Sequence, residues 1–239
     1  MDQNTVLVTG ANSGIGLAIS KLFLQKGYFV FAHYRNDEKD LFKLGKKNLF
    51  PVRGDLSDPK VVKDIFIQCL HKKDRLDILV NNAGALSASN NIEDIEEEDF
   101  DYIICVNLKA PFLLSQFAIK HMKKQNSGKI INVSSIGVKY GGNPNSASYT
   151  ISKAALEAMT LSFSKAGAPY NILVNTVRAG VTNTKLHQKN SKKNMDERIA
   201  MIPLKRWAEP EEIASTILFL ASEDSSFTTG TILTVAGGE

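Results

Sequence analysis

The chain has 239 residues, of which 43% are hydrophobic and 23% charged, and its formal net charge is +4. This composition is typical of one globular domain with a sizeable core. The two cysteines predict neither a disulfide framework nor a metal site, and the modest charge argues against a nucleic-acid-binding surface. No apolar run reaches the roughly 18 residues that a membrane helix needs, and no secretory leader precedes the first strand, so we expect a cytoplasmic protein.

The first predicted element is a short strand at 6–9, followed by a glycine-rich loop at 10–16 and an amphipathic helix that ends near Gly27. Glycines let a backbone approach a pyrophosphate closely, and the N-terminus of the following helix presents free N–H groups to it. The pattern therefore predicts a nucleotide-binding site. The alternative is an ordinary strand-to-helix turn that uses glycine for its shape alone.

The second predicted strand, 29–33, ends in residues that bear on the choice of cofactor. In nucleotide-binding folds of this kind an acidic residue at this point binds the adenosine ribose. Here Tyr34 and Arg35 follow the strand, and the first carboxylate comes at Asp37. Arginine suits a 2′-phosphate, so NADP(H) is predicted over NAD(H). Ser13 is not basic, so the glycine loop adds no second phosphate ligand.

The rest of the chain continues the alternation of strands and helices. Strand-like apolar runs lie at 49–52, 76–80, 129–133, 172–177 and 230–235, and helical patterns at 59–72, 100–117 and 213–221. Strands that are apolar on both faces and separated by helices indicate a parallel sheet covered on both sides. No linker, internal repeat or low-complexity tract interrupts this pattern, which predicts a single α/β domain over residues 1–239.

The helix predicted at 100–117 contains two notable features. The acidic residues at 96–99 are explained by the helix dipole rather than by a binding patch. Pro111 lies within the helix and cannot donate to the carbonyl of Asn107, four residues earlier. That carbonyl is left to accept from water or a side chain. The alternative is a kink with no chemical purpose.

Tyr149 and Lys153 are four residues apart at the start of a predicted helix, so they lie on one face, one turn apart. A positive charge beside a phenol stabilises the phenolate, and we therefore expect the pKa of Tyr149 to fall below its usual value of about 10. Such a tyrosine can donate and accept a proton near neutral pH. The spacing alone is common and gains weight only from the motifs around it.

Together these motifs resemble the short-chain dehydrogenase/reductase family over essentially the whole chain. The resemblance implies a Rossmann-type, doubly wound sheet with the strand order 3-2-1-4-5-6-7. It also implies an oxidoreductase that interconverts a ketone and a secondary alcohol, and assembly of the chain into dimers or tetramers. The matching positions are Thr9, Gly10, Gly14, Gly16, Asp55, residues 81–84, Asn107, Ser135, Tyr149, Lys153, Thr184 and the segments 229–230 and 237–238.

The resemblance also implies a role for each site residue, and it implies no metal. Tyr149 would be the general acid or base, and Ser135 would hydrogen-bond the reacting oxygen. Lys153 would lower the pKa of Tyr149 and bind the nicotinamide ribose, while Asn107 would hold a water in a proton relay. The cofactor would be bound by Gly10, Asn12, Ser13, Gly14, Ile15, Gly16, Tyr34, Arg35, Asp55, Leu56, Asn82, Ala83, Gly84, Tyr149, Lys153, Gly180, Val181 and Thr184.

The chain departs from the family pattern at three places. Ala179 stands where proline usually precedes Gly180, which costs loop rigidity but no hydrogen-bond donor, so cofactor binding should survive. Ser135 precedes Tyr149 by 14 residues rather than the common 13, which leaves Ser134 as an alternative. Ala236 occupies a position where aspartate is frequent.

A basic segment near the C-terminus bears on the substrate. Seven Lys or Arg and two acidic residues lie between Lys185 and Arg206, overlapping a stretch at 182–203 that we expect to be a mobile substrate lid. Such a segment suits an anionic handle such as phosphopantetheine, coenzyme A or a sugar nucleotide. The alternative is a lid that is merely solvated.

Within the family, the chain is most similar to bacterial 3-oxoacyl-carrier-protein reductases, which implies a carbonyl substrate carried as an acyl thioester. Asn126 and Tyr170 stand where those reductases usually carry the arginines that dock the carrier protein, which weakens this assignment. The alternatives are a sugar nucleotide or small ketone as substrate, or a non-catalytic nucleotide-sensing scaffold.

Overall fold

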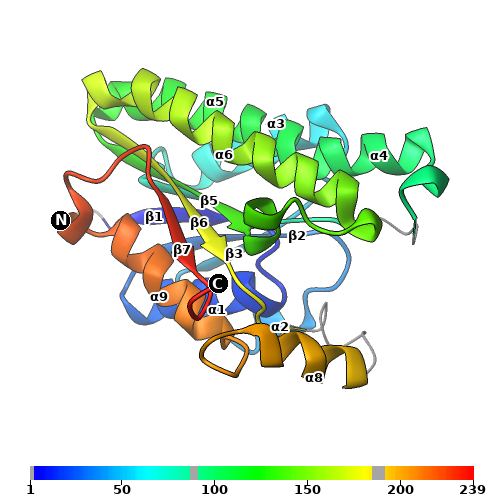
Figure 1. Cartoon of the computed structure of the whole chain (residues 1–239). Helices are drawn as coiled ribbons and strands as arrows, with labels where there is room; N and C mark the ends of the chain where they lie inside the picture. Colours follow the sequence, from blue (N-terminus) through cyan, green and yellow to red (C-terminus); the bar gives the residue numbers. More distant parts are fainter. Residues whose placement is uncertain (1–2, 87–90, 185–191) are drawn as a thin grey trace.

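The computed structural model describes residues 3–86, 91–184 and 192–239, which form a doubly wound α/β fold (Figure 1). The strands pair in parallel in the order β3-β2-β1-β4-β5-β6-β7. The predicted fold class and strand order are confirmed. The strands are β1 (Thr5–Val8), β2 (Phe29–Tyr34), β3 (Leu49–Arg53), β4 (Ile78–Asn81), β5 (Gly128–Ser135), β6 (Ile172–Ala179) and β7 (Ile232–Val235).

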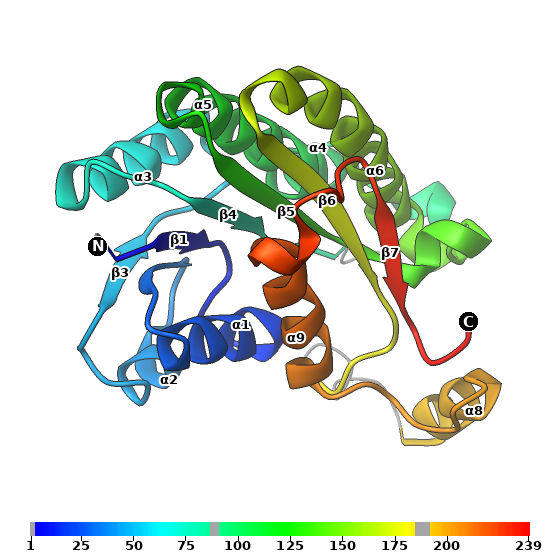
Figure 2. The ribbon, with the colours of Figure 1, turned by 90° about the vertical axis from the view of Figure 1, so that its left-hand side faces the viewer.

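Helices cover both faces of the sheet, with α3, α5 and α6 on one side and α1 and α9 on the other (Figure 2). The helices are α1 (Gly14–Gln25), α2 (Lys39–Phe42), α3 (Pro59–Lys72), α4 (Glu97–Ile104), α5 (Ala110–Gln125), α6 (Ala147–Gly167), α8 (Lys192–Met201) and α9 (Pro210–Ala221). Short 3₁₀ turns are η1 (Ile92–Asp94), η3 (Ile136–Tyr140), η4 (Pro144–Ser146), η5 (Ala168–Tyr170) and η6 (Glu223–Ser225).

The central strands are buried on both faces, as their continuous apolar runs require. Val6 and Val8 of β1 pack in one core with residues of α1 and α9. Leu7, between them, packs in a second core with residues of α3 and α5. This alternation follows from the two-residue period of a strand, and it divides the interior into two cores separated by the sheet.

The long helix around the predicted catalytic Asn107 contains a π turn. The helix runs from Glu97 to Gln125 and passes through η2 (Cys105–Lys109), where the N–H of Ala110 bonds to the carbonyl of Cys105, five residues back. Pro111 has no N–H to offer the carbonyl of Asn107. π turns are rare and often lie at functional sites, and here one surrounds a residue that the sequence motifs selected.

Among the described residues, this one helix is long and apolar enough to cross a membrane by length and composition alone. Its most apolar 18-residue window has a mean hydropathy of 1.5, and 44% of that window is buried. Leu114, Ala118 and Met122 pack in the core that α3 also covers. Its apolar character is therefore accounted for by packing within the fold.

The sheet reverses its strand order between β1 and β4, and the chain segments at the carboxyl ends of these strands diverge there. In the segment where a lid was predicted, Thr182 forms a bridge with Ala208, and α8 follows. Met195 of α8 packs in a small core with Val181 and Ile202. Residues 185–191 of the predicted lid lie outside the described residues.

Candidate active site

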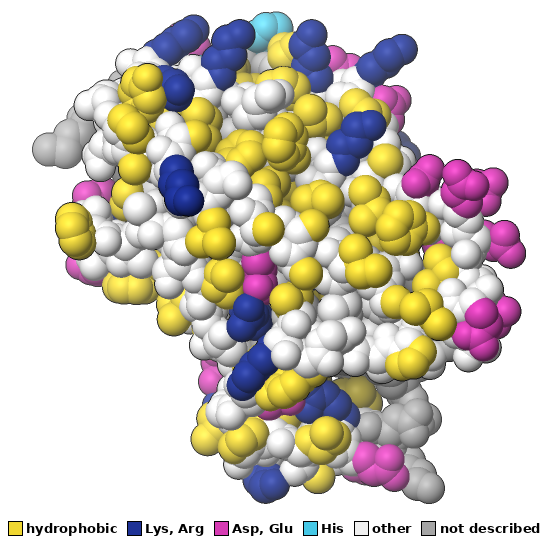
Figure 3. Space-filling view, turned by 45° about the horizontal axis from the view of Figure 1, so that its top comes forward, with side chains coloured by type: hydrophobic (Ala, Val, Ile, Leu, Met, Phe, Trp, Pro, Cys, Tyr) yellow, Lys and Arg dark blue, Asp and Glu magenta, His cyan; other side chains and the backbone are white. Residues whose placement is uncertain are grey.

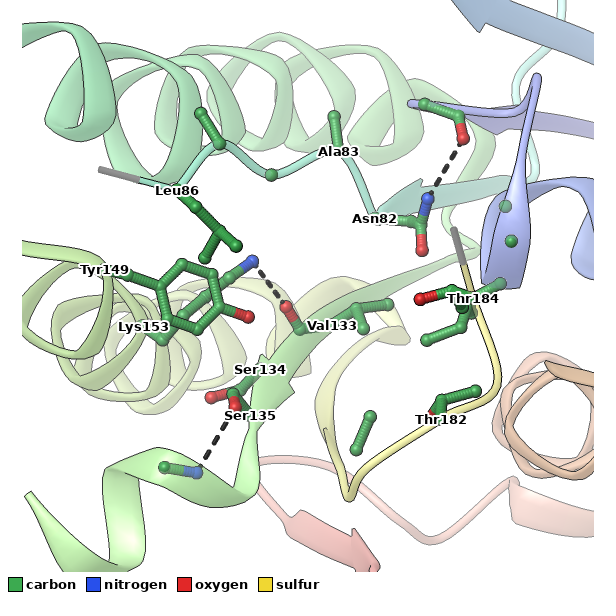
Figure 4. A pocket seen from close by; sticks show the side chains of 18 of the residues that line it. Asn82, Ala83, Leu86, Val133, Ser134, Ser135, Tyr149, Lys153, Thr182 and Thr184 are labelled. Carbon is green, nitrogen blue, oxygen red and sulfur yellow. Dashed lines mark hydrogen bonds between the residues drawn. The ribbon is translucent and has the colours of Figure 1, made fainter. Parts of the chain in front are cut away.

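A cavity of about 1330 Å³ opens at the carboxyl edge of the sheet (Figure 4). It is lined by the ends of β1, β2, β4, β5 and β6 and by the helices and turns that follow them. The predicted catalytic and cofactor-binding residues all line it, except Tyr34 and Asn107. The structure therefore brings together positions that are spread over most of the sequence.

The glycine loop between β1 and α1 closes one side of this cavity. Gly10 and Gly14 have φ angles of +63° and +50°, which residues with a side chain rarely adopt. A Cβ at Gly16 would lie 2.1 Å from the carbonyl oxygen of Gly10 and 2.6 Å from Nδ2 of Asn82, so no larger residue fits. Asn82 in turn donates to the carbonyl of Thr9 at 2.8 Å. The loop is thereby fastened to the end of β4, with the N-terminus of α1 free to receive a phosphate.

His33, near the end of β2, is a site residue that the sequence analysis treated only as part of a strand. Its Nδ1 accepts from the N–H of Gly10 at 3.2 Å, and its Nε2–H donates to the carbonyl of Gly54 at 3.1 Å. Burial lowers its pKa to about 4, so the ring is neutral at physiological pH. His33 therefore joins the glycine loop to the segment that begins at Gly54. The sequence signal that could have identified His33 is that it is a polar residue in the otherwise apolar strand β2, next to the glycine loop.

Tyr34, which the resemblance placed at the cofactor, does not line the cavity. Its ring packs in the core with α1, and its hydroxyl donates to Glu38. Side chains alternate along a strand, so Tyr34 and the next residue, Arg35, point in different directions. Arg35 lines the cavity, where its guanidinium donates to the hydroxyl of Tyr102.

The first carboxylate after β2 is engaged in starting a helix. Asp37 accepts from the N–H of Lys39 at 3.0 Å through Oδ1, at the beginning of α2. Its backbone carbonyl accepts from the side chain of Asn12 at 2.8 Å, which links the end of β2 to the glycine loop. Arg35 and Asp37 both line the cavity, and Arg35, which is nearer the strand end, contacts Tyr102.

Tyr149 and Ser135 line the other end of the cavity, where the Ser135 hydroxyl accepts from the N–H of Gly137 at 3.2 Å (Figure 4). Ser134 does not take this place, because its hydroxyl donates to Glu157 at 2.7 Å. The pKa of Tyr149 is raised, because burial disfavours the phenolate more than the nearby Ser135 side chain favours it. The expected fall of the pKa is therefore not observed.

Lys153 lies one turn beyond Tyr149, as predicted. Its Nζ donates to the carbonyl of Val133 at 2.8 Å and lies 5.7 Å from the centroid of the Tyr149 ring. Burial lowers its pKa to about 8, because an ammonium group is poorly solvated there. The Lys153 ammonium was expected to stabilise the Tyr149 phenolate, but its hydrogen bond goes to the carbonyl of Val133.

Asn107 is fully buried, and its side chain is occupied by protein groups. Oδ1 accepts from the N–H of Ala85 at 2.7 Å, and Nδ2 donates to the carbonyl of Ala85 at 2.9 Å. Nδ2 also donates to the hydroxyl of Ser152 at 3.0 Å. The side chain therefore links the segment after β4 to α6, beside Tyr149 and Lys153. The role of Asn107 in a proton relay stays a prediction.

The segment after β6 passes close to both the glycine loop and the C-terminus. A Cβ at Gly14 would lie 3.0 Å from Cγ2 of Thr184, and a Cβ at Gly180 would lie 2.7 Å from Cα of Ala236. A small residue at position 236 therefore suits this close approach. Gly180, Val181 and Thr184 all line the cavity, in agreement with their predicted place around the cofactor.

The described members of the basic segment are largely engaged within the protein. Arg198 pairs with Glu239 at 2.5 Å, and Arg206 pairs with Glu212 through two contacts of 2.6 and 2.7 Å. Lys205 donates to the carbonyl of Ala200, near the end of α8, at 2.7 Å. Three of the seven cations thus have partners within the protein, and the side chains of the other four lie outside the described residues, so both interpretations of the segment stay predictions.

The residues around the cavity fit a nicotinamide dinucleotide. The glycine cradle, which a single Cβ would fill, suits a pyrophosphate, and the Tyr149 end supplies a proton donor. Within residues 3–86, 91–184 and 192–239, no group of three or more His, Cys, Asp or Glu side chains is placed to hold a metal ion.

Comparison with known proteins agrees with this geometry. Residues 10–239 match a family model described as enoyl-(acyl carrier protein) reductase. The chain is 38% identical to the 3-oxoacyl-[acyl-carrier-protein] reductase FabG of Thermotoga maritima, covering 100% of this chain and 98% of that protein. It is 40% identical to the FabG of Rickettsia conorii, covering 98% and 95% of the two chains.

Similar solved structures give the same result. One, assigned provisionally as a betaketoacyl-ACP reductase, superposes with a TM-score of 0.88 at 34% identity and covers 98% of this chain and 97% of its own. Another, described as a short chain dehydrogenase/reductase family protein, has a TM-score of 0.87 at 32% identity, with coverage of 98% and 96%.

Proposed function

The chain belongs to the short-chain dehydrogenase/reductase family, an oxidoreductase acting on the CH–OH/C=O pair with a nicotinamide cofactor, and from this premise we propose that it reduces 3-oxoacyl thioesters with NADPH. The observation that carries the proposal is that Ser135, Tyr149 and Lys153 line the same cavity as the glycine cradle. This arrangement places a proton donor where a bound carbonyl can meet a hydride. The non-catalytic alternative is not retained, because the family is enzymatic.

The reduction needs a group that polarises the carbonyl oxygen and gives it a proton. The nicotinamide supplies the hydride when bound. The Ser135 hydroxyl donates a hydrogen bond to the substrate oxygen, and Tyr149 gives that oxygen its proton. Because burial raises the pKa of Tyr149, the phenol is protonated at neutral pH and suited to this donation. Lys153, with a pKa of about 8, adds positive charge beside the phenol as the proton leaves.

The preference for NADPH rests on Arg35. Its guanidinium lies at the cavity wall beside Tyr102. The nearest carboxylate on the chain, Asp37, also lines the cavity, but its Oδ1 accepts from the N–H of Lys39 at the start of α2. We expect Arg35→Leu to lower the ratio of kcat/KM for NADPH to that for NADH by tenfold or more, because the 2′-phosphate loses a charge-assisted partner. Lys43→Leu, which removes an exposed cation just after α2, is the control. An unchanged ratio would contradict the assignment.

The thioester substrate is supported by the curated relatives, whose names specify a 3-oxoacyl group on a carrier protein. On this chain Lys123 lies 4.2 Å from the ring centroid of Tyr170, so a cation is present at the corner where the docking arginines are missing. The test compares oxidation of NADPH with acetoacetyl thioesters of carrier protein and of coenzyme A against a panel of small ketones and keto sugars. Turnover of ketones without turnover of either thioester contradicts the proposal.

A second copy of the chain is the partner that the surface suits best. Phe112, Ile151 and Leu161 are 42%, 53% and 45% exposed, and apolar side chains are spread over the face that carries α5 and α6 (Figure 3). We expect dimers or tetramers by light scattering. Leu161→Glu should lower the assembled fraction, because a charge would be buried between copies.

A further inference from the structure

A buried carboxylate lies one helical turn beyond the reactive pair of α6. Glu157 is 5% exposed, and both of its oxygens are hydrogen-bonded. Oε1 accepts from the Ser134 hydroxyl at 2.7 Å and from Nε of Arg178 at 2.9 Å. Oε2 accepts from NH2 of Arg178 at 2.6 Å. The three side chains come from α6, β5 and β6, so one carboxylate joins three elements.

The two partners of Glu157 occupy equivalent places on neighbouring strands. Ser134 and Arg178 are paired in the register of β5 and β6. The residues that follow them, Ser135 and Ala179, are also paired, and both line the cavity. Holding Ser134 and Arg178 therefore fixes the point at which each strand enters the site.

The helix meets β5 through three residues spaced by one turn. Tyr149, Lys153 and Glu157 lie on one face of α6, because residues four apart on a helix are neighbours. Tyr149 lines the same cavity as Ser135, Lys153 donates to the carbonyl of Val133, and Glu157 accepts from Ser134, the residue between Val133 and Ser135. Tyr149 and Lys153 belong to the reaction site. Glu157 holds the same stretch of β5 from outside that site.

We propose that Glu157 is a positioning residue of the reaction. With Ser134 and Arg178 it holds the ends of β5 and β6 against α6, and so sets the approach of Ser135 to Tyr149. A buried ion pair is a weak source of net stability, because desolvation of the charges offsets their attraction, so its main effect here is geometric. It also restrains Ala179, where the family usually has proline. The inference rests on the proposed role of Tyr149 and Ser135, but not on which carbonyl compound is the substrate.

An equivalent cluster at the opposite edge of the sheet provides a matched control. Asp77, at the start of β4, accepts from Nε of Arg75 at 2.7 Å and from the Thr5 hydroxyl at 3.1 Å. The chemistry is the same as at Glu157, namely a carboxylate that holds an arginine and a hydroxyl. Asp77 does not line the cavity, so its loss should affect folding without affecting the site.

The experiment measures kcat, KM, the dissociation constant of NADPH and thermal unfolding for Glu157→Gln, Glu157→Leu and Asp77→Leu, with any ketone that the wild type reduces. We expect Glu157→Leu to lower kcat by ten- to a hundredfold, because small displacements of reacting groups are costly, with the NADPH dissociation constant changed less than threefold. Glu157→Gln keeps an acceptor for Ser134 and should recover most of kcat. Asp77→Leu should lower the melting temperature and leave kcat within twofold.

A kcat for Glu157→Leu within twofold of wild type overturns the proposal, as does a loss of kcat in Asp77→Leu of the same size. If Glu157→Leu does not fold, Ser134→Ala decides the matter, since it removes only one hydroxyl. A three- to tenfold fall of kcat is then expected, and an unchanged kcat overturns the proposal. Failure of the thioester proposal would appear separately, in the substrate range of the wild type.

Discussion

The two edges of the central sheet contain similar hydrogen-bonding groups but only one of them forms a site. At the amino edge, Asp77 holds Arg75 and Thr5, and at the carboxyl edge Glu157 holds Arg178 and Ser134. Both clusters tie neighbouring elements together. Only the second borders the cavity, so the chemistry of a cluster does not by itself decide its function.

The difference arises from what the chain does beyond each edge. At the amino edge the connections are closed by direct contacts, such as Gln125 Nε2 to the carbonyl of Leu76 at 3.0 Å and the N–H of Thr5 to Asp77 at 2.8 Å. At the carboxyl edge the segments after β1 and β4 diverge where the strand order reverses, and a cavity of about 1330 Å³ remains. Topology thus makes one edge available for ligands.

The largest effect on activity is expected when one tyrosine hydroxyl is removed at each edge of the sheet. Tyr149→Phe should lower kcat by about 10²- to 10⁴-fold, because it removes the proton donor, while NADPH binding is retained. Tyr28→Phe, just before β2, also removes the hydroxyl of a partly buried tyrosine and should leave kcat unchanged. Steady-state kinetics and cofactor titration measure both. Comparable losses in the two variants would mean that the carboxyl edge holds no special proton donor.

The second test uses the titration of His33, which lies at the carboxyl edge of the sheet. Its protonation should change the free energy of unfolding. Burial lowers its pKa from 6.5 to about 4, so between these values the unfolded chain binds a proton that the folded protein excludes. The free energy of unfolding should therefore fall as the pH drops from 6.5 to 4, by about 3 kcal/mol in total. Above pH 6.5 the group has no effect.

Denaturant unfolding at pH 7.5, 5.5 and 4.5 measures this dependence, with His33→Gln as the control. Glutamine offers an acceptor and a donor but does not titrate, so its unfolding curve should lose this component of the pH dependence. NADPH affinity should follow the same trend in the wild type, since protonation removes the acceptor for the N–H of Gly10. A slope identical in both proteins would exclude His33 as its source.

Positions fixed by backbone geometry could be predicted from the sequence, whereas those fixed by side-chain networks could not. The glycine loop, Asn82 and the Tyr149–Lys153 spacing are short-range patterns, and the fold places them as the resemblance implied. The contacts of His33 and Glu157 join elements that are 20 or more residues apart in sequence. Such contacts depend on the register of the assembled sheet, which no local pattern encodes.

The pKa of Tyr149 illustrates the same limit. A spacing of four residues predicts that Lys153 lies near the phenol, and it does, 5.7 Å from the ring centroid. The spacing does not predict that Lys153 is buried, nor that its ammonium donates to Val133. Burial then has the largest effect on the phenol, and its pKa rises instead of falling.

Glycine substitutions at the two edges give the smallest effects and sharpen the comparison most directly. Gly16→Ala should destabilise the fold by about 1–3 kcal/mol, because its Cβ would meet the carbonyl of Gly10 and the side chain of Asn82. Gly27→Ala, between α1 and β2, meets no atom within 4 Å, but its φ of +84° should cost about 1–2 kcal/mol. The two losses of stability are therefore similar in size and different in cause.

NADPH titration and denaturant unfolding should separate them: Gly16→Ala weakens cofactor binding more than tenfold, whereas Gly27→Ala leaves it unchanged. Equal affinities in the two variants would mean that the close approach at Gly16 serves packing alone.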